Sequence, residues 1–252
     1  IMGYRDERLW KILEEKAAQE DKELRTERQI APEYLSAVKT VCDYGVQRAK
    51  TIRDTFPLYT LHDEVHICNV LNLMAELLGD EIERLNRDEV AMLILSACCH
   101  DIGMSYSKEE KEELFKDGPR IERYLNANHS EYIKAYQHGG ENPVLTDDMK
   151  QNYLRSIHHE RVQELLNKIE WPWILDGMVD RDDLIRVCRS HGEGSASLSD
   201  LEKSHRIDLR FCAILLRLAD ILDFDSSRAP DALYEYSEMT GQRSSSGLFS
   251  KE

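Results

Sequence analysis

Apolar residues recur along most of this chain at intervals of three and four, which is the period of an amphipathic α-helix. The pattern is clear in residues 35–46, 66–77, 90–99 and 211–222. Strand-like alternation over more than a few residues is absent from the sequence, and so is an internal repeat. The sequence therefore predicts an all-α fold, built as a helical bundle.

The chain begins with a predicted helical arm and first core helix over residues 1–57. Residues 5–29 are dense in charge, with sparse apolar positions that could dock on the body of the protein or on a second copy. Pro32 then begins a second helix. We expect the main domain at residues 58–238. Residues 239–252 are rich in Ser and Gly and are predicted to be a flexible tail or linker, so the chain could be a fragment of a longer protein.

A charge-rich stretch over residues 106–146 interrupts the apolar pattern. It contains Gly118-Pro119, Gly139-Gly140 and Asn142-Pro143, which favour turns, so short helices joined by turns are expected there. Insertions of this kind commonly form a lid over a functional site. We therefore expect a lid in this stretch.

Four residues with metal-binding side chains lie inside or at the end of strongly apolar stretches. His100 and Asp101 close one such run, His66 lies on the apolar face of its helix, and Asp220 lies within residues 211–222. A buried carboxylate is costly unless it is compensated, and a divalent cation is one form of compensation. An ion pair with an arginine or a solvent-facing stripe is the alternative for Asp220. A satisfied core histidine is the alternative for His66.

Two further histidines stand in positions that favour a site. His158 follows Arg155 by three residues and so shares its helix face, and His191 ends a short helical pattern just before a glycine. One metal needs three or four ligands, whereas six candidate ligands suggest two metals. Two ions about 3.5–4 Å apart are the usual arrangement for phosphate chemistry. His62, one turn before His66, could reach a substrate or support the ligands.

Taken in order, these residues resemble the HD superfamily of metal-dependent phosphohydrolases. The HD signature of that superfamily is similar to Ala97-Cys98-Cys99-His100-Asp101-Ile102-Gly103. Its first histidine helix is similar to the helix of His66 and Val70, and its closing Asp helix is similar to Leu218-Ala219-Asp220-Ile221-Leu222-Asp223. The resemblance covers residues 58–230 and implies an HD-type helical bundle.

The resemblance also implies how the ligands divide between two metals. It implies a first group made of His66, His100, Asp101 and Asp220. It implies a second group made of His158 and His191, with Asp101 bridging the two metals. His159 could take the place of its neighbour His158.

A narrower resemblance rests on two sequence patterns. The forms Thr60-x-His62-x-x-x-His66 and Asp220-Ile221-Leu222-Asp223-x-Asp225-x-x-Arg228 look most like a bacterial branch found beside chaperone-type ATPase modules in conflict or defence systems. That branch implies a role in antiviral defence and a fused or neighbouring regulatory module. The nucleotide-cyclase-linked signalling branch is disfavoured, because the chain contains no Gly-Tyr-Pro tripeptide.

Imidazole and carboxylate ligands suit one or two divalent ions of Mn, Fe, Ni, Zn or Mg. We hypothesise that a water on these metals loses a proton near neutral pH and attacks a phosphorus atom. An arginine would hold the phosphate by a forked contact; the candidates are Arg155 and Arg228, with Arg217 as a weaker one. Pairing with a surface acid is the alternative for each arginine. The predicted catalytic residues are Asp101, Arg155, Arg228 and His62.

The chain of 252 residues is strongly acidic, with a formal net charge of −15 and a pI near 5.1. Such a charge disfavours a non-specific grip on long nucleic acid, which needs a basic stripe. A small anionic phosphate substrate, such as a nucleotide, is easier to accommodate. A local basic funnel of Arg155, Arg161 and Arg228 could still admit a nucleic acid strand end. The acidic surface and the helical arm are compatible with a homo-oligomer.

The six cysteines lie in apolar helical contexts without a CxxC framework, so buried core thiols are favoured over metal ligands or nucleophiles. They are Cys42, Cys68, Cys98, Cys99, Cys188 and Cys212. The sequence shows no signal peptide and no apolar stretch of membrane length. A reduced, cytoplasmic protein without a membrane partner is therefore expected.

Three functions compete on these observations. The first is a two-metal phosphohydrolase acting on a nucleotide or a phosphodiester, including a nuclease acting on single strands. The second is an HD-type di-iron oxygenase, which would consume oxygen and release no phosphate. The third is a non-catalytic domain that keeps its metal for stability and senses a nucleotide or serves as a scaffold.

Overall fold

The computed structural model describes residues 3–24, 29–56, 64–139 and 143–223. These residues contain eleven α-helices and a single pair of two-residue strands, so the predicted all-α class is confirmed. The strands β1 (Lys203–Ser204) and β2 (Ile207–Asp208) form a short antiparallel hairpin.

The centre of the bundle is α5 (Arg87–Cys99), in which every residue except Glu89 is buried. Asn86 caps its first turn, accepting from the main-chain N–H groups of Asp88 and Glu89, and the apolar run that follows is buried on all sides. Five helices pack around α5. They are α1 (Arg8–Leu24), α2 (Ala31–Ala49), α4 (Glu64–Leu78), α10 (Arg181–Ser190) and α11 (Leu209–Leu222).

The sparse apolar positions of α1 dock on the body of the protein. Leu9, Leu13 and Ala17 are at most 1% exposed, and the helix packs against α2, α4 and α5. Its polar side also contributes to the interior, because Glu20 forms ion pairs with Arg87 of α5 and with Arg206 of the hairpin.

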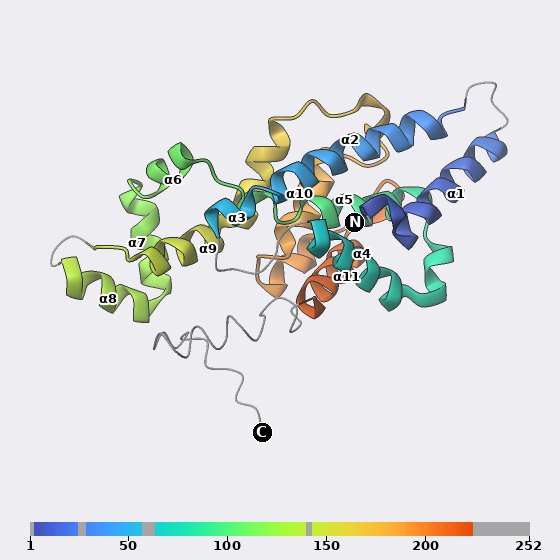
Figure 1. Cartoon of the computed structure of the whole chain (residues 1–252). Helices are drawn as coiled ribbons and strands as arrows, with labels where there is room; N and C mark the ends of the chain where they lie inside the picture. The colour runs from blue at the N-terminus through green and yellow to red at the C-terminus, as the bar shows by residue number, and fades with distance from the viewer. Residues whose placement is uncertain (1–2, 25–28, 57–63, 140–142, 224–252) are drawn as a thin grey trace.

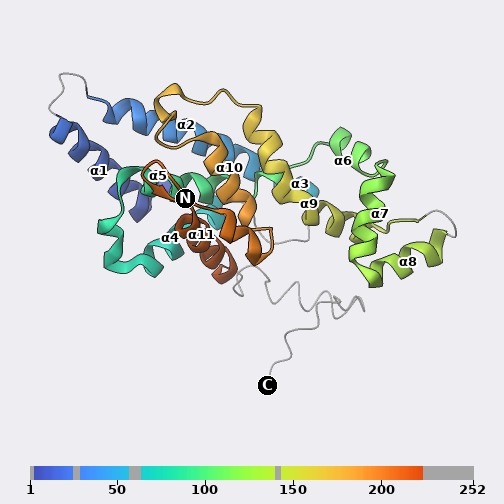
Figure 2. The same ribbon diagram turned by 180° about the vertical axis from the view of Figure 1, so that it is seen from behind.

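A second, smaller lobe stands at one end of the molecule, with α1 at the other end (Figures 1 and 2). It contains α6 (Lys108–Leu114), α7 (Gly118–Ala127) and α8 (His129–Gly139), and short helices joined by turns are thus confirmed in this stretch. The lobe has a core of its own, made of Ile121, Tyr124, Leu125, Ala135, Met149 and Tyr153. That it acts as a lid stays a prediction.

The long helix α9 (Asp147–Asn167) joins the lobe to the bundle. Met149 and Tyr153 in its first half belong to the core of the lobe, whereas Val162 and Leu165 in its second half belong to the main core. The two ends of α9 therefore belong to two separate hydrophobic cores, and its middle residues lie between these cores.

The other elements of the described residues are short. They are η1 (Tyr4–Asp6), α3 (Ile52–Thr55), η2 (Gly79–Arg84), η3 (Ile102–Met104), η4 (Trp173–Leu175) and η5 (Ser195–Asp200). All six cysteines are buried free thiols, as the sequence indicated. Among the described helices, none alone is long and apolar enough to span a membrane. One bent pair, Arg87–Met104 with Lys108–Leu114, meets the criteria of length and composition, and its first member includes the buried helix α5.

Candidate metal centre

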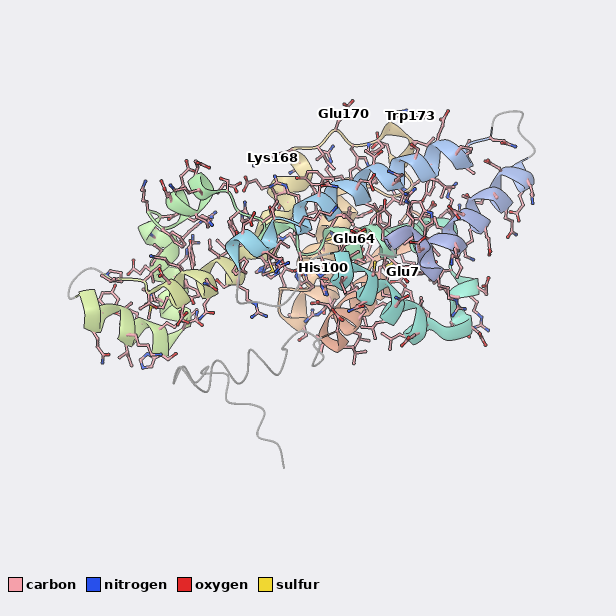
Figure 3. All side chains as sticks on the ribbon, in the orientation of Figure 1. Glu7, Glu64, His100, Lys168, Glu170 and Trp173 are labelled. Carbon is pink, nitrogen blue, oxygen red and sulfur yellow. The ribbon has the colours of Figure 1, made fainter. Side chains whose placement is uncertain are left out.

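The structure brings the six predicted metal ligands together from five helices. His66 lies in the first turn of α4, and His158 lies in the second half of α9. The other four are His100 and Asp101 at the end of α5, His191 at the end of α10, and Asp220 in α11. Figure 3 shows His100 in the central region of the molecule. The predicted catalytic residues His62 and Arg228 lie outside the described residues.

Four of these residues form one group of donor atoms, which we name position A. The Nε2 atoms of His66 and His100 are 3.1 Å apart. Asp101 Oδ2 lies 3.5 Å from the first of these nitrogens and 3.2 Å from the second. Asp220 Oδ1 lies 3.5 and 3.7 Å from the same two atoms. Position A therefore offers two imidazole nitrogens and two carboxylate oxygens.

A second group of donor atoms, which we name position B, shares Asp101 with the first. The Nε2 atoms of His158 and His191 are 2.7 Å apart. Asp101 Oδ1 lies 3.5 Å from the former and 3.4 Å from the latter. Because Oδ2 of Asp101 faces position A and Oδ1 faces position B, one carboxylate links the two groups.

Three of the four histidines are oriented by the main chain three residues earlier. His100 Nδ1 lies 3.0 Å from the carbonyl oxygen of Ala97, and His158 Nδ1 lies 2.5 Å from that of Arg155. His191 Nδ1 bonds in the same way to the carbonyl of Cys188. A carbonyl only accepts, so each Nδ1 donates a proton, and Nε2 is the nitrogen that faces the other donor atoms.

The donor atoms fit divalent cations. Two nitrogens that each lie about 2.0–2.1 Å from one ion stand about 3 Å apart, as the Nε2 pairs of positions A and B do. Facing lone pairs at such distances repel unless a proton or a metal ion lies between them. Both groups can hold a metal ion, His66, His100 and Asp101 at A and Asp101, His158 and His191 at B. The mixture of imidazole and carboxylate suits Mn, Fe, Ni, Zn or Mg.

Electrostatics differ between the two positions. At position A, burial opposes charge on His100, but the carboxylates of Asp101 and Asp220 outweigh it and raise the pKa of His100 well above its usual range. Burial also opposes charge on Asp220, and His100 outweighs it, lowering the pKa of Asp220. At position B, burial and the neighbouring His191 lower the pKa of His158 to about 3. His158 is therefore neutral at pH 7, the form that binds metal.

The carboxylate of Asp223 and the amide of Asn69 stand behind His66. Asp223 Oδ2 lies 2.6 Å from His66 Nδ1, and Asn69 Nδ2 donates to Asp223 Oδ1 at 2.8 Å. Asp223 belongs to the sequence motif quoted around Asp220, whereas Asn69 was not singled out from the sequence. The available signal was spacing, because Asn69 follows His66 by one helical turn and Asp223 follows Asp220 by one turn.

His158 lies at the metal centre, and its neighbour His159 packs elsewhere. A Cβ atom placed on Gly192 would lie 2.6 Å from the His159 ring, so His159 covers Gly192 at the end of α10. Gly103 makes a still closer approach, since a Cβ there would lie 1.9 Å from the main-chain oxygen of His158. Glycine at position 103 therefore lets the segment after Asp101 lie against α9.

Arg161, which the sequence offered as one member of a basic funnel, is buried in the structure. Its side chain is 7% exposed, and Nη1 donates to the main-chain oxygens of Gly103 at 2.6 Å and Ser105 at 2.9 Å. The guanidinium also lies 3.8 Å from the centre of the Tyr106 ring and pairs with Glu110 at 2.9 Å. Arg161 therefore fastens the segment after Asp101 to α9 and is not available to a substrate.

The remaining arginine candidates differ in setting. Arg155 is exposed on α9, one turn before His158, and its main-chain carbonyl orients that histidine. Arg217 lies on α11, one turn before Asp220. Its Nη1 atom is buried and has no hydrogen-bond partner within the described part of the chain. A buried guanidinium nitrogen in this state has a donor left for an anion.

Comparison with known proteins gives one match. A family model described as HD-CE matches residues 56–246, most of the chain and all six predicted ligands. No curated protein matches the chain, and no solved structure does.

Proposed function

Because the chain belongs to the HD-CE family, an HD-domain family, we propose that it is a metal-dependent phosphohydrolase acting on a nucleotide or a phosphodiester. The observation that carries this proposal is the position of Asp101. Its Oδ2 atom lies 3.2 Å from His100 Nε2, and its Oδ1 atom lies 3.4 Å from His191 Nε2. Two donor groups joined by one carboxylate suit two divalent ions acting on one phosphate.

Each ligand has a defined task in this proposal. The carbonyl partners of His100, His158 and His191 hold those rings so that Nε2 of each faces the other donor atoms, where it would hold an ion. Asp101 fixes the distance between positions A and B, and Asp220 adds negative charge to position A. When bound, the ions supply a water of lowered pKa and offset the negative charge of the phosphate.

We assign substrate phosphate binding to arginine side chains near the ligands. Arg217 is supported by its buried donor, by its place one turn from Asp220, and by the forked geometry with which guanidinium groups bind phosphate. Arg155 is supported by its place one turn before His158. A small anionic substrate suits the acidic chain better than a long nucleic acid does.

We also propose that the activity serves defence against viruses, as in the HD branch that the sequence resembles. The support is the pair of patterns around His66 and Asp220. In a bacterial host, expression of the chain should then lower the number of phage plaques. Equal plaque counts for the wild type and Asp101→Ala would remove this part of the proposal.

The first experiment measures product release by Mn²⁺-loaded protein from a panel of phosphate compounds. The panel contains nucleoside mono- and triphosphates, cyclic and linear dinucleotides, and single-stranded oligonucleotides. Asp101→Ala should abolish turnover and lower the metal content, while the helical circular dichroism signal persists. Asp183→Asn is the matched control, because Asp183 is a buried carboxylate of α10 that is not among the ligands.

The outcome separates the candidate functions. Turnover of one class of compound, lost in Asp101→Ala and kept in Asp183→Asn, would establish a phosphohydrolase and its substrate class. Oligonucleotide cleavage alone would assign a nuclease. Metal-loaded protein that turns over nothing in the panel would refute the phosphohydrolase. Oxygen consumption by the iron-loaded protein would then assign an oxygenase, and its absence a sensing or scaffold domain.

A further inference from the structure

The two metal positions are supported differently behind their ligands. At position B, both histidines have a main-chain carbonyl as the partner of Nδ1. At position A, His100 has such a carbonyl, whereas His66 has the carboxylate of Asp223. A carboxylate partner carries a full negative charge, whereas a carbonyl is neutral. The carboxylate therefore makes the opposite ring nitrogen a stronger electron-pair donor to a metal ion than a carbonyl partner would.

Asp223 is itself held in place on three sides. It is 5% exposed, and its main-chain N–H donates to the carbonyl of Ala219 at the end of α11. Asn69 Nδ2 holds Oδ1 at 2.8 Å, which leaves Oδ2 directed at His66. A carboxylate fixed in this way keeps the His66 ring in one orientation without an entropic cost when a metal binds.

Position A also has more ligands. It combines His66, His100, Asp101 and Asp220, whereas position B combines His158, His191 and the shared Asp101. The additional carboxylate at A and the charged partner of His66 favour a cation there. Both differences favour tighter metal binding at position A than at position B.

We propose that Asp223 is a positioning residue that acts through His66 and makes position A the tighter of the two metal positions. Position A then fills first, and position B holds an ion that exchanges more readily. This inference deepens the proposed function and rests only on its metal-binding part, because it requires two bound ions and no particular reaction.

The test is a titration of metal-free protein with Mn²⁺, with free Mn²⁺ followed by electron paramagnetic resonance. The wild type should show two classes of site, one tight and one weak. Asp223→Asn should weaken the tight class about 10–100-fold, the usual cost of losing a partner behind a ligand, and leave the weak class unchanged. His191→Ala should remove the weak class and keep the tight one.

Two controls separate positioning from general stability. Asp183→Asn makes the same substitution at a carboxylate of similar burial, 6% exposed against 5% for Asp223, and should leave both classes unchanged. Asn69→Ala, which frees one oxygen of Asp223 without touching His66, should weaken the tight class less than Asp223→Asn does. Thermal unfolding in a chelator shows that each variant folds.

The proposal is overturned if a folded Asp223→Asn protein keeps the tight class, or if it loses both classes equally. Two unequal classes that respond as described, in a protein that hydrolyses no phosphate compound, would uphold this inference and refute the proposed function. A folded wild-type protein that binds no Mn²⁺ would refute both.

Discussion

The structure contains two partly buried clusters of ionisable side chains that differ in how their charges are balanced. One is the metal centre. The other, which we name the charge network, joins α1, α2, α5 and the hairpin through Glu20, Tyr34, Arg87, Asp88 and Arg206. In the network, guanidinium groups meet carboxylates at 2.7–2.8 Å, and Arg87 lies 3.9 Å from the centre of the Tyr34 ring. In the metal centre, carboxylates meet imidazole nitrogens whose lone pairs converge.

The two clusters differ in what balances their charged and electron-donating groups. The network contains two arginines and two acids, so the chain supplies both signs of charge. The candidate metal centre gathers donors of electron pairs, a set that can hold a metal ion. Burial of charge therefore does not by itself indicate function; the kind of group that faces each charge does.

The largest expected effect concerns the network. Arg87→Leu removes the guanidinium and leaves Asp88, a 2% exposed side chain, with much of its compensation gone. We expect a loss of about 3–5 kcal/mol in the free energy of unfolding, measured in urea. Mn²⁺ affinity should not change. Arg84→Leu is the matched control, since Arg84 pairs with Glu81 at the surface and should cost at most about 1 kcal/mol. An equal effect of both variants would contradict the importance of burial.

Metal removal should act on the other cluster alone. At Mn²⁺ about 100-fold above its dissociation constant, binding stabilises the folded protein by about 2.7 kcal/mol. Thermal unfolding with Mn²⁺ and with a chelator measures this difference. Arg87→Leu should show the same increment as the wild type, because distant sites act additively. A smaller increment in that variant would mean that the two clusters are coupled.

Arg217→Ala tests a guanidinium outside the network. If its buried Nη1 donor serves a substrate phosphate, losing it costs about 1.5–3 kcal/mol of binding, or at least about tenfold in KM. Metal content should be kept, as should the unfolding curve within about 0.5 kcal/mol. Steady-state kinetics beside Arg84→Ala are the measurement. A loss of stability with unchanged KM would assign Arg217 to the structure instead.

Gly103→Ala should lower both stability and metal affinity, because it changes the packing beside the candidate metal centre. The added Cβ would meet the main-chain oxygen of His158 at 1.9 Å, so the segment after Asp101 must move away from α9. We expect a cost of about 1–3 kcal/mol in stability together with weaker Mn²⁺ binding at position B. Gly194→Ala is the control, since no atom lies within 4 Å of a Cβ there. Unchanged binding at B would show that α9 follows the movement.

The sequence predicted the fold class, and the six residues that it singled out as metal ligands lie together in the structure. That they bind metal stays a prediction. Four of them, His66, His100, Asp101 and Asp220, interrupt or end an apolar helical stretch, where a charged side chain is costly unless it is compensated. His158 and His191 were chosen from their helix positions and from the resemblance to the HD superfamily. The choice between two adjacent histidines was harder to make from the sequence. His158 and His159 are neighbours in the sequence, and only the direction of α9 in the fold decides that His158 faces Asp101.

The residues that hydrogen-bond to the ligands could not be predicted from the sequence, and the reason is physical. Asp223 and Asn69 matter through the orientation of the His66 ring, which depends on how α4 and α11 pack. The sequence also offered Arg161 as a member of a basic funnel, but the side chain is buried in the structure. Its guanidinium is taken up by carbonyl oxygens more than 50 residues away in the sequence, and spacing along the chain carries no signal of such contacts.

The continuity of α9 gives the lobe a mechanical connection to one ion position. A helix of 21 residues is about 30 Å long and resists bending, so a force on its first half reaches His158 as a tilt of the whole rod. Position B, which depends on His158, would feel that tilt, whereas the ligands of position A stand on α4, α11 and the end of α5. A displacement of the lobe would therefore move His158, and with it the geometry of position B, before it reached His66 or Asp220.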